Sequence, residues 1–109
     1  MTRATKKRRT SPAAQHVPEL ADLFRLLGDG TRLRIVLACL QTPVAVSAIA
    51  ERLELSVSLV SHHLRLLRAM HVVRPTRHGK QVFYVAADQH IRSMIRGMLE
   101  HLSEPRVEA

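Results

Sequence analysis

Four residues near the C-terminal end of the chain have side-chain types and a spacing that suit metal binding. Asp88 and His90 begin the stretch DQHIRSMIRGMLEHLSE, and His101 and Glu104 end it. Two imidazoles and two carboxylates form a tetrahedral donor set that suits Zn²⁺ first and Co²⁺ second. Ni²⁺ prefers more ligands and would need another, such as His16, which makes it a minor option. The alternative is that Asp88 and Glu104 simply begin and end a helix.

The residues between these two pairs have the spacing of an amphipathic helix. Apolar side chains recur at steps of three and four residues, at Ile91, Met94, Ile95, Met98, Leu99 and Leu102. At 100° per residue, His90 and His101 point within about 20° of each other, but eleven residues of helix separate them by roughly 16 Å. The two pairs cannot meet inside one chain. We therefore expect two antiparallel copies of this helix to form two identical sites across a homodimer.

A basic block without acidic residues lies in the second half of the chain. The whole chain has 17 Lys and Arg against 9 Asp and Glu, a formal net charge of +8. From Leu55 to Ala87 there is no acidic residue, while five basic residues fall in this interval, namely Arg65, Arg68, Arg74, Arg77 and Lys80. Such a block favours a polyanionic partner, and double-stranded DNA in particular, over an ordinary basic surface.

Length and composition predict one small domain with a polar extension. Residues 1–15 are basic and contain nothing that could bury surface, so we expect a disordered tail there and a DNA-binding and dimerisation domain over 16–109. The single Cys39 excludes an internal disulfide and is expected to pack as a small hydrophobic residue. No apolar run is long enough to span a membrane. We therefore expect a cytoplasmic protein without a membrane partner.

The elements that position the charged residues can be read from apolar spacing and capping residues. A helix is predicted over 18–27, and a second helix that Thr31 caps is predicted to end near Gln41, before Pro43. A short helix capped by Ser47 and a longer one from Ser56 or Val57 then form a helix-turn-helix. The residues of the second helix that we expect to contact DNA phosphates and base edges are Ser56, Ser58, Ser61, His62 and Arg65.

A basic hairpin is predicted directly after the helix-turn-helix. β-Branched and aromatic residues at 72–73 and 82–85 flank the sequence RHGK, in which Gly79 suits a turn position with positive φ. Pro75 must then lie where the sheet needs no donor. The hairpin is a wing, and its Arg77 and Lys80 can reach DNA phosphates or the minor groove. The expected fold class is mainly α with a small β-hairpin, a winged helix-turn-helix.

Together these residues resemble the ArsR/SmtB metal-sensing repressors. The likeness covers about residues 19–104 and includes GDGTRLRIVLACL, LSVSLVSHHLRLLRAMHVV, the hairpin and the last helix. It implies a homodimer through the first and last helices that releases operator DNA when an inducer binds. The family's zinc-type pattern, Asp-x-His and, after ten residues, His-x-x-Glu, matches Asp88, His90, His101 and Glu104. Sites of the arsenic, cadmium and lead types need cysteines near the helix-turn-helix, where this chain has the sequence VAVS.

The resemblance also implies a route from the metal to DNA. In similar zinc sensors the C-terminal histidine ligand bonds a backbone carbonyl at the end of the recognition helix, and the matching pair is His101 and the carbonyl of His71. The expected function is a repressor that binds operator DNA as a metal-free homodimer and is released by Zn²⁺ or Co²⁺. One alternative is a repressor of the same fold that responds to Ni²⁺, to redox conditions or to no signal. A hydrolytic metalloenzyme is not expected, because four protein ligands leave no open position for water.

Overall fold

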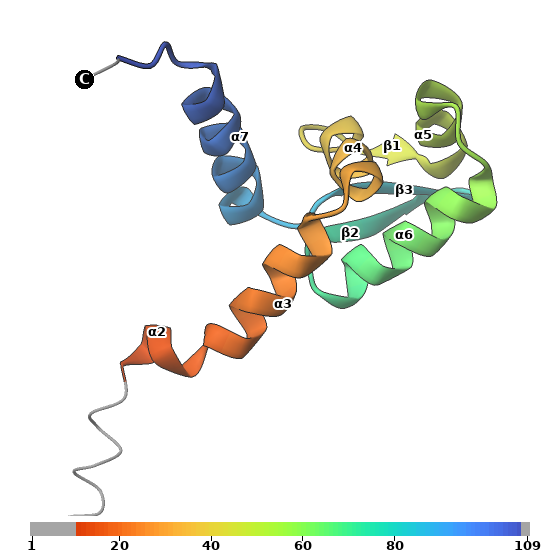
Figure 1. Ribbon diagram of the computed structural model, residues 1–109. Helices are drawn as coiled ribbons and strands as arrows, with labels where there is room; N and C mark the ends of the chain where they lie inside the picture. Colours follow the sequence, from red (N-terminus) through yellow and green to blue (C-terminus); the bar gives the residue numbers. More distant parts are fainter. Residues whose placement is uncertain (1–10, 108–109) are drawn as a thin grey trace, which may run out of the picture.

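The computed structural model describes residues 11–107, and Figure 1 shows the arrangement of their elements. The helices are α2 (Pro12–Gln15), α3 (Val17–Leu27), α4 (Gly30–Ala38), α5 (Val46–Leu53), α6 (Val57–Ala69) and α7 (Gln89–Ser103). The strands are β1 (Val44–Ala45), β2 (Val73–His78) and β3 (Gln81–Ala86). The expected fold class is confirmed, since α5 and α6 form a helix-turn-helix and β2 and β3 form the hairpin after it. Within residues 11–107, no helix is long and apolar enough to cross a membrane.

The described part of the chain begins with a short helix inside the predicted tail. Ser11 caps α2 by accepting a hydrogen bond from the backbone N–H of Ala14 at 3.1 Å, and Pro12 stands at the first helical position. Both features stabilise a helix start without any burial, and every residue of α2 is exposed. The predicted tail over residues 1–15 thus contains a short exposed helix at residues 12–15, and its disorder stays a prediction. Its remaining part, residues 1–10, lies outside the described residues.

Two helix starts differ from those expected. Asp29, not Thr31, caps α4, and its carboxylate accepts from the backbone N–H of Arg32 at 3.0 Å. Aspartate is the stronger capping residue of the two, and Thr31 lies within the helix. Helix α5 begins at Val46, one residue before the expected cap Ser47, and has no side-chain cap. The pairing of β1 with β3 holds the chain immediately before α5 instead.

The sheet has three antiparallel strands in the order β1-β3-β2. The pairing of His78 with Gln81 leaves a two-residue turn in which Gly79 has a φ of 64°, as the sequence predicted. Pro75 lies in β2, which is an edge strand, the place where a sheet tolerates proline. Strand β1 was not predicted, because two residues are too few to produce an alternating pattern.

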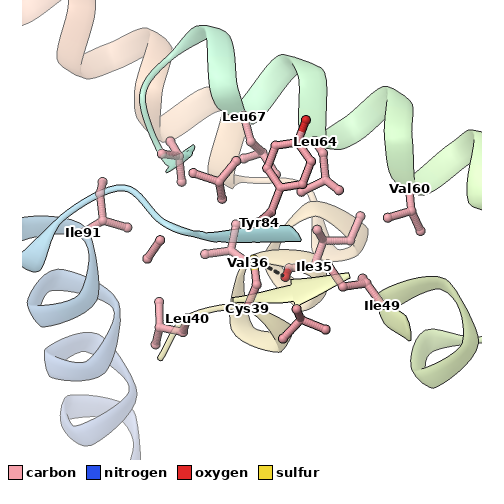
Figure 2. Close-up of a cluster of buried hydrophobic side chains, with 14 of the residues drawn as sticks. Ile35, Val36, Cys39, Leu40, Ile49, Val60, Leu64, Leu67, Tyr84 and Ile91 are labelled. Atoms are coloured by element: carbon pink, nitrogen blue, oxygen red, sulfur yellow. Dashed lines mark hydrogen bonds between the residues drawn. The ribbon is translucent and has the colours of Figure 1, made fainter. Parts of the chain in front are cut away.

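The buried face of α6 fixes which side of this helix is left for solvent. Val60, Leu64 and Leu67 are fully buried against α4, α5 and the sheet, and Figure 2 shows them in the buried cluster. Burying a side chain of this size stabilises a fold by about 1.5–3 kcal/mol. Leu59 of the same helix is 39% exposed, because the buried stripe is centred on the other three residues.

The apolar faces of α3 and α7 are largely uncovered within one chain. Both helices extend away from the body formed by α4, α5, α6 and the sheet (Figure 1). Phe24 of α3 is 55% exposed, and Leu102 of α7 is 66% exposed. Only the first half of α7 is anchored, through the buried Ile91 and Ile95. The amphipathic stripes that the sequence predicted are thus present, but one chain does not bury them.

Candidate metal centre and DNA-binding face

Asp88 and His90 form a pair at the start of α7. Asp88 is the N-cap, and its Oδ1 accepts from the backbone N–H of Ile91 at 3.0 Å. This bond, with a smaller contribution from His90, lowers the pKa of the Asp88 carboxyl, so the group is charged at neutral pH. The Nδ1 of His90 lies 3.7 Å from the same oxygen, and the His90 side chain is 95% exposed. Asp88 therefore does cap the helix, and its carboxylate still has lone pairs that could bind a cation.

His101 and Glu104 lie at the other end of the same helix. His101 is in the last turn of α7 and Glu104 is its C-cap, and both side chains are exposed. In the part of the chain that the structure describes, no three His, Cys, Asp or Glu residues are close enough to hold a metal ion together. The structure thus brings Asp88 to His90 but keeps that pair apart from His101 and Glu104. Each end of α7 offers two exposed donors that fit half of a four-ligand site.

His71 lies just after α6, the second helix of the helix-turn-helix, which we call the reading helix. It follows α6 with a φ of 60°, in the left-handed region that only a few non-glycine residues adopt, and its N–H donates to the carbonyl of Arg68 at 3.0 Å. Beside it lies a surface cavity of about 670 Å³ between α3 and the end of α6. His16 and Glu19 also line this cavity, with the His16 Nδ1 2.7 Å from a Glu19 carboxylate oxygen.

The exposed face of α6 holds the residues predicted to contact DNA. Ser58, His62 and Arg65 are exposed and Ser61 is half-buried, as the sequence indicated. Ser56 is the N-cap, and its hydroxyl accepts from the backbone N–H of Leu59 at 3.0 Å. The Ser56 side chain thus holds the start of the helix, where free backbone N–H groups and the helix dipole favour a phosphate.

Val57 is a residue of this face that the sequence reasoning missed. It is the first helical residue of α6 and is 52% exposed, although its side chain is apolar. The first turn of a helix in a major groove lies against base edges, and a small apolar side chain there can contact a thymine methyl group. The signal available in the sequence was its position directly after the capping serine.

The wing places two basic side chains beyond the helix-turn-helix. Arg77 pairs with Val82 near the tip of the hairpin, Lys80 lies in its turn, and both are exposed. His78 is the last residue of β2, with its ring edge-on to Phe83 at a centroid distance of 5.0 Å. The hairpin can therefore present Arg77 and Lys80 to a phosphate backbone.

His63 points to the inner side of α6, unlike its neighbour His62. Its Nδ1 accepts a hydrogen bond from Nε of Arg32 in α4 at 3.1 Å. Partial burial, and secondly the positive charge of Arg32, lower the pKa of the His63 imidazole. The structure thus gives His63 a structural contact with α4. Sequence patterns carry no signal for this contact, because the two residues are 31 positions apart.

Cys39 is buried, as expected, and its thiol donates to the carbonyl of Ile35 at 3.4 Å (Figure 2). Burial raises the pKa of the thiol to about 12. A protonated, inaccessible thiol is a poor nucleophile and a poor ligand. Redox sensing through this residue therefore has little chemical support.

Known proteins match both the sequence and the fold. Residues 29–74 match the family model "Bacterial regulatory protein, arsR family". A transcriptional repressor SmtB homolog from Synechocystis sp. is 36% identical over 79% of this chain and 65% of its own length. A cadmium resistance transcriptional regulatory protein CadC homolog from Staphylococcus aureus is 31% identical over 84% of this chain and 77% of its own length.

A solved structure extends the likeness to almost the whole described chain. The homodimeric winged helix-turn-helix DNA-binding domain from Mycobacterium bovis superposes with a TM-score of 0.75. It is 21% identical and covers 92% of this chain and 95% of its own. The fold of both chains is a winged helix-turn-helix.

Proposed function

The chain belongs to the arsR family of bacterial regulatory proteins, and we propose that it is a metal-responsive transcriptional repressor. As a metal-free homodimer it binds operator DNA, and it releases the DNA when Zn²⁺ or Co²⁺ binds. The observation that carries the proposal is that each end of α7 exposes two potential metal ligands, on a helix whose apolar face is uncovered.

The uncovered apolar faces of α3 and α7 support a homodimer. Large apolar side chains on both helices are 45–66% exposed in one chain, namely Leu20 (49%), Phe24 (55%), Met98 (57%), Leu99 (45%) and Leu102 (66%). Apolar surface of this extent is rarely left in water on a monomeric protein. Packing α3 and α7 against the same helices of a second chain would cover it. An antiparallel pair of α7 helices would bring each Asp88 end to the opposite His101 end.

The donor set supports Zn²⁺ or Co²⁺ as inducer. Asp88 and His90 of one subunit, with His101 and Glu104 of the other, would supply two nitrogen and two oxygen ligands with no thiolate. The bound ion would hold the two α7 helices in one relative position. His16, the extra ligand that Ni²⁺ would need, already pairs with Glu19, which makes Ni²⁺ the weaker alternative.

The route from α7 to DNA is the proposed bond between His101 and the backbone carbonyl of His71. A histidine that binds a cation through one ring nitrogen can donate from the other, and such a bond orients the ring. The cavity beside His71 and the exposed position of both residues leave room for this contact. An inducer changes DNA affinity only if it binds one dimer geometry better than another, and this bond would link the two.

The DNA side of the proposal uses α6 and the wing. Ser58, Ser61, His62 and Arg65 would contact base edges and phosphates in the major groove, with Ser56 at the helix start. Arg77 and Lys80 would contact the neighbouring backbone from the hairpin.

A titration with two readouts tests the proposal. DNA is first selected in vitro by the metal-free protein, and its affinity is then measured by fluorescence anisotropy without metal and with Zn²⁺, Co²⁺ or Ni²⁺. Equilibrium dialysis in parallel should give one Zn²⁺ per chain. We expect Zn²⁺ to weaken DNA binding by about 10-fold or more, which corresponds to a coupling free energy of 1.4 kcal/mol.

Two variants separate regulation from DNA binding. His101→Ala should bind DNA as tightly as the wild type without metal and should no longer respond to Zn²⁺. His78→Ala removes a histidine outside the site and should keep the full response. Equal DNA affinity of the wild type with and without Zn²⁺ would contradict the proposal and favour a repressor of the same fold that responds to another signal.

A further inference from the structure

Arg32 connects three helices through its backbone and its side chain. Its N–H donates to the capping carboxylate of Asp29 at 3.0 Å, which fixes the residue in the first turn of α4. Its Nη1 donates to the carbonyl of Leu26, in the last turn of α3, at 3.2 Å. Its Nε donates to Nδ1 of His63, in the middle of α6, at 3.1 Å. The guanidinium thus joins the end of α3 directly to the helix that faces DNA.

No other side-chain hydrogen bond between residues 11 and 107 joins α3 or α4 to α6. The buried leucines and valine of α6 hold it on the core through contacts that have no preferred direction, whereas a hydrogen bond also fixes the relative direction of its two partners. The bond to His63 sits on the side of α6 next to this apolar stripe. It is therefore placed to set the rotation of α6 relative to α3.

The bond requires a neutral His63. Arginine has only donors, so Nδ1 must be the unprotonated nitrogen of the ring, with the proton on Nε2. The charged groups that face the imidazole are Arg32 of α4 and Asp29 before it, with His62 on α6 at a ring-centroid distance of 5.5 Å. Protonation of Nδ1 would put two donors and two positive charges against each other.

We propose that Arg32 and His63 form a positioning link that holds the DNA-reading face of α6 in register with α3, and that the link works only while His63 is neutral. The inference rests on the proposed function, because it takes α6 as the helix that contacts DNA and α3 as part of the dimer interface. A change in the relative position of the two α3 helices then reaches the reading helix of each subunit. Mild acidification breaks the link and weakens DNA binding.

The test compares DNA affinities at pH 7.5 and pH 5.5, at constant ionic strength and with a chelator present. His63→Asn places an oxygen acceptor where Nδ1 was and cannot take up a proton in this range. The wild type should lose about 10-fold more affinity on acidification than this variant, the size expected when a hydrogen bond to a charged group is lost. His16→Gln is the control. It removes an exposed histidine that is not among the proposed DNA contacts and should keep the wild-type loss.

Further measurements keep the proposal testable if a variant folds poorly. Ring ¹⁵N chemical shifts of the wild type, assigned by comparison with the His63→Asn spectrum or by selective labelling, should show His63 as the Nε2–H tautomer with Nδ1 accepting a bond. Arg32→Ala should abolish that signature and bind DNA weakly at both pH values.

The results test the Arg32–His63 link separately from the proposed function. The link is refuted if the wild type and His63→Asn lose affinity equally on acidification, or if Nδ1 of His63 carries the proton at pH 7.5. If in vitro selection with the wild type yields no bound DNA at either pH, the proposed function itself is refuted, whatever the state of the His63 ring.

Discussion

Leu102→Ala offers a direct test of whether α7 is a dimer interface. The side chain lies in the last turn of α7 and is 66% exposed in the single chain, so the chain itself buries only a third of it. If a partner α7 covers the rest, truncation to alanine removes apolar burial of about 1 kcal/mol per copy, or about 2 kcal/mol per dimer. Alanine is the best helix former, so the helix itself should not suffer.

The measurement is the dimer dissociation constant of the metal-free protein by sedimentation equilibrium. A loss of about 2 kcal/mol corresponds to a roughly 30-fold weaker dimer. Val107→Ala serves as the control, because Val107 lies beyond α7, is 94% exposed, and should change nothing. An unchanged dissociation constant for Leu102→Ala, or an equal effect of both variants, would refute the assignment of α7 to the interface.

Three further predictions follow from individual side chains. Arg65→Ala should weaken DNA binding and reduce the slope of log affinity against log salt by about 1 per subunit, because each phosphate contact releases roughly one counterion. Titrations at several salt concentrations measure this slope, and an unchanged slope would show that Arg65 contacts no phosphate. Cys39 should react with a thiol reagent far more slowly in the native protein than in urea at pH 8, since its pKa is about 12 and it is buried; equal rates would place the thiol at the surface. The lowered pKa of His63 means that the unfolded chain takes up this proton at higher pH than the folded chain does, so the free energy of unfolding should fall as pH decreases below about 6.5. Urea titrations from pH 7.5 to 5.5 should show a smaller fall for His63→Asn than for the wild type, and identical falls would contradict the assignment.

The candidate metal ligands and the reading helix could be recognised from the sequence, because each is indicated by a pattern among residues that are close together in the chain. The positions of His90 and His101 on one helix follow from a period of 3.6 residues, and the start of α6 follows from a capping serine before an apolar repeat. Gly79 marks a turn because few other residues adopt positive φ. Each of these features is specified by a few neighbouring residues, so the amino-acid sequence alone is enough to predict it.

Tertiary structure decided the features that depend on residues far apart in the chain. The sequence gives no hint that Arg32 lies beside His63, or that a two-residue strand at Val44 pairs with β3, since packing alone brings these segments together. Exposure was also decided there: Leu59 and Leu102 both occupy apolar positions of amphipathic helices, yet neither is buried in one chain. Periodicity tells which residues share a helix face, whereas what covers that face depends on the neighbouring elements and, in the dimer that we propose, on a second copy of α7.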